Sequence, residues 1–142
     1  MASKSSIKTP MNRVLGLGSA KDGVGHWWEQ RLSSIALIPL TLLFVAPFLS
    51  AYGQSAFGAE GHLAVLAIYS DPSNAIVAIL FVAVSFWHLQ QGLQVVIEDY
   101  VHAKAARTTL LIGNALGCWA VAAVGVFAIL KIAFTAAPEF AG

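Results

Sequence analysis

Three long stretches of the sequence carry no Asp, Glu, Lys or Arg, and they decide what this chain can fold into. They cover residues 32–59, 73–97 and 108–130, which are 28, 25 and 23 residues long. An α-helix rises 1.5 Å per residue, so even the shortest stretch extends about 34 Å and can cross a hydrocarbon core about 30 Å thick. Backbone amides left unpaired in lipid cost several kcal/mol each, and three segments cannot close a β-barrel. The sequence therefore predicts three membrane-spanning helices.

The composition agrees with a membrane protein and excludes several other classes. Hydrophobic residues make up 58% of the 142 positions and charged residues 11%, whereas soluble domains carry about 25% charged residues. The net charge of +1 would not hold phosphates, so we expect no nucleic-acid partner. The single cysteine cannot form an intrachain disulfide. We expect one all-α domain over residues 1–142, a transmembrane three-helix bundle with spans at about 32–51, 74–97 and 108–130.

The positions of the basic residues predict the orientation in the lipid bilayer. Five of them precede the first span, none lies between the first two spans, two lie between the second and third, and Lys131 follows the third. Because basic residues are enriched in cytoplasmic loops, we expect a cytoplasmic N-terminal segment at 1–31 and a C-terminus outside. The first 21 residues are acid-free, as in a transit peptide, but we expect the chain to retain them. We therefore expect a multi-pass protein of the bacterial inner membrane rather than one imported by mitochondria.

The connection between the first two spans contains an apolar island at Leu63–Tyr69. Seven residues are too few to cross a bilayer, so we expect this segment to lie at the surface. Asp71 and Pro72 follow it and predict the start of the second helix, because Asp caps helices and Pro is tolerated in the first turn.

A stripe of small residues marks the third span. Gly113, Gly117 and Ala120 are spaced by four and then three residues, which places them on one helix face. Small residues let a second helix approach closely. The partner is either a helix of another chain or the other two spans of this one.

His88 is the most informative residue, because a titratable group inside a membrane span is costly and marks a functional site. It lies twelve residues before Tyr100, about 18 Å into the helix and near mid-membrane. Gly92 lies on the same face and leaves room for a flat group such as a haem macrocycle. The CxxCH attachment motif is absent, so such a haem would be a non-covalent b-type. The alternatives are a neutral core histidine bonded across the bundle and a proton-relay histidine.

The other three histidines do not reach the depth of His88. His26 and His102 fall at the cytoplasmic edge, and His62 falls in the outer loop. If the iron has two histidine ligands, the second must come from another polypeptide. Three short helices also have little apolar depth in which to enclose a haem alone. We therefore expect an obligate partner subunit.

Polar residues gather at the cytoplasmic ends of the first two spans. Asp99 lies within about 20° of the His88 face, and Tyr100 follows it. A phenol can donate a hydrogen bond to a carbonyl while a neighbouring carboxylate relays protons, which suits a quinone headgroup. Arg31 at the mouth of the first span could bind a haem propionate or a quinone oxygen. The alternative for all three is an ordinary interfacial anchor.

One set of residues follows the pattern of a known family: the segment HWWEQRLSS from His26 to Ser34, then His88, Gly92 and the segment Val95–His102. With this pattern the chain resembles the small hydrophobic membrane anchor subunit of bacterial succinate dehydrogenase. The resemblance covers about residues 24–130, and its specific part is the eleven-residue step from the histidine to the Asp-Tyr pair. It implies a four-subunit complex. A flavoprotein subunit and an iron-sulfur subunit oxidise succinate, and this chain and a second haem-ligating membrane anchor subunit bind one haem b and reduce ubiquinone.

The resemblance also implies roles for single residues. His88 would be an axial ligand of the haem iron, and Tyr100 would bond a ubiquinone carbonyl with Asp99 in the proton path. Arg31 and His26 would lie by the haem propionates or the quinone pocket. Glu98 is an alternative proton carrier.

Three other functions compete with this one. They are the anchor of a related fumarate reductase, a haem-free structural membrane anchor and a small proton-coupled transporter. Three helices are too few for the inverted repeats of a transporter. The first two alternatives stay open on the sequence.

Overall fold

A computed structural model describes residues 21–50, 58 and 60–140 of the chain. Within these ranges the chain forms helices and no strand, and the helices are α2 (Lys21–Leu49), α4 (Gly61–Ser70), α5 (Pro72–Tyr100) and α6 (Lys104–Phe140). Three helical segments are long and apolar enough to cross a membrane: Val24–Leu49, Pro72–Tyr100 and Lys104–Thr135. The predicted all-α fold with three spans is confirmed. The features expected within residues 1–20 lie outside the described residues.

The helices are longer than the spans expected from the sequence. The helix α2 begins at Lys21, eleven residues before the expected start of the first span, and continues through Pro39 and Pro47. The expected boundary marks where charged residues end and the apolar stretch begins, and the helix begins earlier than that stretch. A helix can continue past the hydrocarbon core into the interface, where water solvates its charged side chains. Glu29 and Arg31 therefore lie on the same helix as the apolar span.

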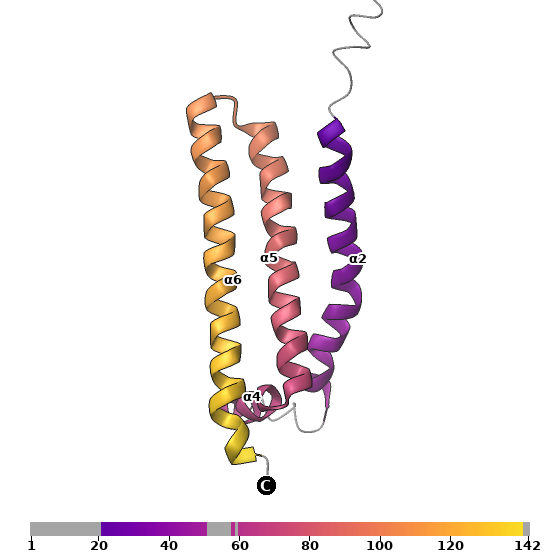
Figure 1. The fold of residues 1–142 in the computed structure, drawn as a ribbon, viewed down its shortest axis with the longest axis vertical. Coiled ribbons are helices and arrows are strands. Elements are labelled where there is room, and N and C mark those ends of the chain that lie inside the picture. The colour runs from indigo at the N-terminus through magenta and orange to yellow at the C-terminus, as the bar shows by residue number, and fades with distance from the viewer. Residues whose placement is uncertain (1–20, 51–57, 59, 141–142) are drawn as a thin grey trace, which may run out of the picture.

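The central helix of the bundle is α5 (Figure 1). It packs against α2 on one side and α6 on the other, and α4 crosses the end of the bundle near the start of α5. Residues 101–103 join the end of α5 to the start of α6. This connection lies at the end of the bundle opposite α4, beside the start of α2. Residues of α5 can therefore face α2 along most of the length of the bundle.

The short helix α4 spans ten residues and is too short to cross a bilayer, as expected. Ala64 and Ile68 are buried, and α4 contacts both α5 and α6. The ring of Tyr69 meets Phe48 edge-on at a centroid distance of 6.2 Å. Burial raises the pKa of the Tyr69 phenol above its ordinary value of 10.0, so this group is neutral at physiological pH.

The helix α5 begins as the sequence predicts. Asp71 is its N-cap, and its side chain accepts a hydrogen bond of 3.2 Å from the backbone N–H of Asn74. Pro72 occupies the first turn, where its missing N–H is not needed. The Asn74 side chain donates to the Ile68 carbonyl at 3.1 Å and so fixes the corner between α4 and α5.

The buried hydrophobic residues of α5 and α6 are small. They are Ala75 and Ala78 on α5, and Cys118 and Ala122 on α6. Further along α6, a Cβ atom added to Gly125 would lie 3.3 Å from Cγ1 of Val82, so the two helices approach closely there. Small residues allow this approach between membrane helices, where the gain comes from van der Waals contact rather than from water exclusion.

The stripe of Gly113, Gly117 and Ala120 does not pack against the other two spans. All three residues are exposed, and a Cβ atom added to either glycine meets nothing within 4 Å. The buried residues Cys118 and Ala122 lie on a different face of α6, because one residue along a helix turns the side chain by 100°. The expectation of packing within the chain is therefore wrong, while pairing with another chain remains a prediction.

Candidate functional site

A pocket of about 320 Å³ lies between α2 and α5. Its lining residues are Trp27, Gln30, Arg31, Ser34 and His88. The four residues of α2 are spaced as i, i+3, i+4 and i+7, so they share one face of that helix. The pocket thus combines an aromatic ring, a guanidinium and an imidazole at one place within the span.

One nitrogen of His88 has a protein partner and the other does not. Nδ1 lies 2.9 Å from Oγ of Ser33, whose side chain is 1% exposed. Nε2 forms no hydrogen bond to the described residues, and it is not among their fully buried unpartnered atoms. A metal-ligating histidine has this pattern, since one ring nitrogen bonds the protein and the other bonds the metal. The alternative of a core histidine bonded across the bundle accounts for Nδ1 but leaves Nε2 without a role.

The surroundings of His88 fit a flat group. Gly92 lies one turn along α5, and a Cβ atom added there would meet nothing within 4 Å. No cluster of three or more His, Cys, Asp or Glu side chains that could hold a metal ion occurs in the part of the chain described. The described residues therefore offer one imidazole rather than a metal cage. They fit a haem whose iron would take one ligand from His88 and another from elsewhere.

Arg31 lies in the same pocket as His88. Its Cζ atom is 5.2 Å from the centroid of the Trp27 ring, a cation–π contact that orients the guanidinium. Arg31 forms no ion pair with any described carboxylate. Among the described residues its donors are therefore left for another acidic group, and an arginine binds a carboxylate strongly and with two parallel hydrogen bonds.

The other predicted site residues lie away from this pocket. Asp99 and Tyr100 are both exposed at the end of α5, and the Tyr100 side chain is 78% exposed. They lie about 16 to 18 Å along the helix from His88. His26 does not line the pocket either, and its Nε2 atom is buried without a hydrogen-bond partner. The structure thus divides the predicted residues between the His88 pocket and the end of α5.

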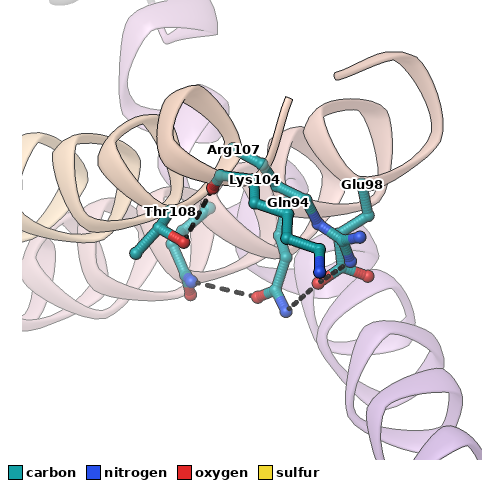
Figure 2. Close-up of polar contacts among 6 residues, drawn as sticks. Gln94, Glu98, Lys104, Arg107 and Thr108 are labelled. Atoms are coloured by element: carbon teal, nitrogen blue, oxygen red, sulfur yellow. Dashed lines mark hydrogen bonds and ion pairs between the residues drawn. The ribbon is translucent and has the colours of Figure 1, made fainter. Parts of the chain in front are cut away.

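The two neighbouring carboxylates at the end of α5 differ in their contacts. Oε1 of Glu98 accepts a hydrogen bond of 3.1 Å from Nε2 of Gln94 and lies 3.9 Å from Nη2 of Arg107 on α6 (Figure 2). Gln90 in turn lies 3.5 Å from Gln94. Asp99 has no ion pair or side-chain hydrogen bond to the described residues. Glu98 is therefore engaged in joining α5 to α6, and the Asp99 carboxylate is free.

Several residues of the site were missed by the sequence analysis. Trp27, Gln30, Ser33 and Ser34 were given no roles of their own. Gln91 was also missed. It is 2% exposed, its Oε1 is unpartnered, and its Nε2 lies 3.5 Å from Oε2 of Glu29. The signal was present, because glutamines at positions 90, 91 and 94 are costly polar groups within a span.

The fold and the pocket define a class of protein. The chain is a multi-pass helical membrane protein. From within a span it presents an imidazole nitrogen and, beside it, a guanidinium, and neither is bonded to another of the described residues. The comparisons with known proteins agree with that class. The chain belongs to the family described as succinate dehydrogenase/fumarate reductase transmembrane subunit, which matches residues 5–129.

Relatives within this family are similar over most of their length. The succinate dehydrogenase hydrophobic membrane anchor subunit of Paracoccus denitrificans is 32% identical over 124 residues, covering 87% of this chain and 91% of the relative. The subunit of the same name from Rickettsia bellii is 35% identical over 126 residues, 88% of each chain. The succinate dehydrogenase membrane anchor subunit of Reclinomonas americana is 31% identical over 106 residues, covering 67% of this chain and 77% of the relative. No solved structure matches the chain significantly. The predicted resemblance is confirmed.

Proposed function

We propose that this chain is the small hydrophobic membrane anchor subunit of a succinate dehydrogenase in a bacterial inner membrane. The family, the names of the relatives and the three apolar helices support the anchor role. The chain would belong to an oxidoreductase complex without binding the dicarboxylate itself. A flavoprotein subunit and an iron-sulfur subunit would oxidise succinate, and the membrane subunits would pass the electrons to ubiquinone. The relatives' names favour succinate oxidation over fumarate reduction as the reaction of the complex.

The partner-free Nε2 of His88 carries the proposal of a haem b site. A bound haem would supply one-electron redox chemistry. His88 would ligate the iron, the open space beside Gly92 would admit the macrocycle, and the free guanidinium of Arg31 would bind a propionate. His26 lies outside the pocket lining, so its role near the propionates is the least supported of these.

A second membrane anchor subunit would complete the site. In an 18-residue apolar stretch of each span, only 6%, 11% and 17% of the residues are buried inside the chain. Most apolar side chains can therefore contact lipid or another subunit. The described residues offer only His88 as a ligand in the pocket. The partner subunit would therefore supply the other axial ligand, and its helices would enclose the haem.

Ubiquinone would bind at the exposed end of α5. The Tyr100 phenol is exposed and can donate a hydrogen bond to a quinone carbonyl oxygen. Asp99, whose carboxylate is free of contacts with the described residues, would deliver protons from the cytoplasm. This end carries more basic residues than the α4 end, which supports a cytoplasmic orientation for it.

The haem proposal is tested by His88→Ala in the complete complex, with His102→Ala as its control. His102 lies exposed beyond the end of α5, so its loss should leave the haem unchanged. We expect His88→Ala to lose the dithionite-reduced b-type absorbance or to shift it greatly, while His102→Ala retains it. An unchanged spectrum in His88→Ala would remove His88 from the ligand set. Absence of b-type absorbance from the wild-type complex would instead favour the haem-free anchor.

A further inference from the structure

We propose that Ser33 is a positioning residue that fixes His88 as the Nδ1–H tautomer and so leaves the Nε2 lone pair available for ligation. The inference rests on the proposed haem role of His88. It adds a residue on a different helix that prepares the imidazole before any iron is bound.

The contacts of Ser33 Oγ decide the tautomer. This atom lies 2.9 Å from Nδ1 of His88 and 3.0 Å from the backbone carbonyl oxygen of Gln30. A hydroxyl has one proton to donate, and a carbonyl oxygen can only accept. A serine within a helix typically donates to the carbonyl three or four residues earlier, which here is Gln30. The proton of the Ser33–His88 hydrogen bond must then come from Nδ1.

The burial of Ser33 makes this arrangement specific. Its side chain is 1% exposed between α2 and α5, so water does not compete for the hydroxyl. A buried polar group that loses its partner is destabilising, because it has already given up its hydrogen bonds to water. The ring of His88 is therefore held in one orientation as well as in one tautomer. In the opposite tautomer Nε2 would carry a proton and could not bind iron.

Thr41 provides a matched control on the same helix. Its Oγ1 donates to the Leu37 carbonyl at 2.6 Å, the same kind of bond within α2 that Ser33 forms to Gln30. Thr41 does not line the pocket, and it forms no hydrogen bond to His88 in the part of the chain described. Removing the Thr41 hydroxyl thus removes a bond within α2 without changing the pocket or the contact at Nδ1.

The test compares Ser33→Ala, Ser33→Thr, Thr41→Ala and His88→Ala in the purified complete complex. Two readouts are used: the electron paramagnetic resonance g-values of the ferric haem and the rate of haem loss to an apoprotein scavenger. Removing the hydrogen-bond partner of a metal-ligating histidine typically costs 10- to 100-fold in metal affinity. We expect Ser33→Ala to shift the g-values and to lose haem at least about tenfold faster. Ser33→Thr, which keeps the hydroxyl, and Thr41→Ala should match the wild type.

The outcomes separate this inference from the proposed function. If His88→Ala loses the haem while Ser33→Ala keeps wild-type g-values and haem retention, the role of Ser33 is overturned and the haem site stands. If His88→Ala keeps its haem, the proposed function itself fails. Should Ser33→Ala not assemble, Ser33→Cys replaces it, because a thiol is a weaker acceptor. An intermediate shift in Ser33→Cys supports the inference, and wild-type values overturn it.

Discussion

The side-chain amide of Asn114 on α6 donates a 2.9 Å hydrogen bond from Nδ2 to the backbone carbonyl of Gln90 on α5. Its Oδ1 lies 3.5 Å from Sγ of Cys118 one turn along α6. Gln90 lies only two residues from His88. This bond therefore joins α6 to the central helix close to the level of the proposed haem ligand.

We predict that Asn114→Ala destabilises the folded chain by about 0.6 to 1.7 kcal/mol, the range measured for hydrogen bonds between membrane helices. Unfolding of the complex in detergent, followed by circular dichroism, would measure the change. Thr109→Ala is the control, because its hydroxyl bonds the Ala105 carbonyl within α6 itself. Equal stability of the two variants would show that the Asn114 bond contributes nothing between the helices.

The sequence predicts the spans well because the cost of charge in lipid depends on local composition alone. The same reasoning places His88 deep in the second span and α4 at the surface. The ends of the helices are harder to predict, since α2 begins at Lys21 and passes Glu29 and Arg31 before it enters the apolar stretch. Water at the interface solvates such residues, so charge marks the edge of the lipid rather than the end of a helix.

The pocket could not be predicted in the same way, because it depends on the register between two helices. Ser33 and His88 are 55 positions apart, and no local pattern states that they meet. The rotation of a helix about its own axis also does not follow from the local sequence. Gly113 and Gly117 are exposed while Cys118 is buried, and these faces differ by the turn of a single residue between positions 117 and 118.

We predict that Tyr100→Phe slows ubiquinone reduction by about five- to tenfold, the effect of losing one hydrogen bond of about 1 to 1.5 kcal/mol. Succinate oxidation with an artificial acceptor should be retained, because that reaction does not need the quinone site. Tyr69→Phe, at the opposite end of the bundle, should leave both rates unchanged. Equal loss of both activities in Tyr100→Phe would indicate failed assembly instead of a quinone contact.

A comparison of Asp99→Asn with Glu98→Gln tests which carboxylate delivers protons. Glu98 is bonded to Gln94 and lies near Arg107, whereas Asp99 is free of such contacts among the described residues. We expect Asp99→Asn to slow quinone reduction by about 10²-fold, the lower end for loss of a positioned proton donor. Glu98→Gln should change the rate little and cost less than about 1 kcal/mol in stability, since its ion pair is half-exposed. The reverse ranking of rates would assign the proton path to Glu98.

The orientation of the chain is open to a direct test with single cysteines at the two ends of the bundle. The native Cys118 is buried and should react slowly with a membrane-impermeant maleimide. Gly58 lies before α4 and Ala103 lies between α5 and α6, and both are exposed. Because basic residues favour the cytoplasmic side, we predict that Gly58→Cys is labelled in intact spheroplasts and Ala103→Cys is not.

Denaturing detergent supplies the control for this labelling, because it dissolves the membrane and removes any subunit that covers the cytoplasmic end. Ala103→Cys should then react as fully as Gly58→Cys. Labelling of Ala103→Cys alone in intact spheroplasts would invert the topology. The Tyr100 end of α5 would then face away from the cytoplasm, and Asp99 could not draw its protons from that side.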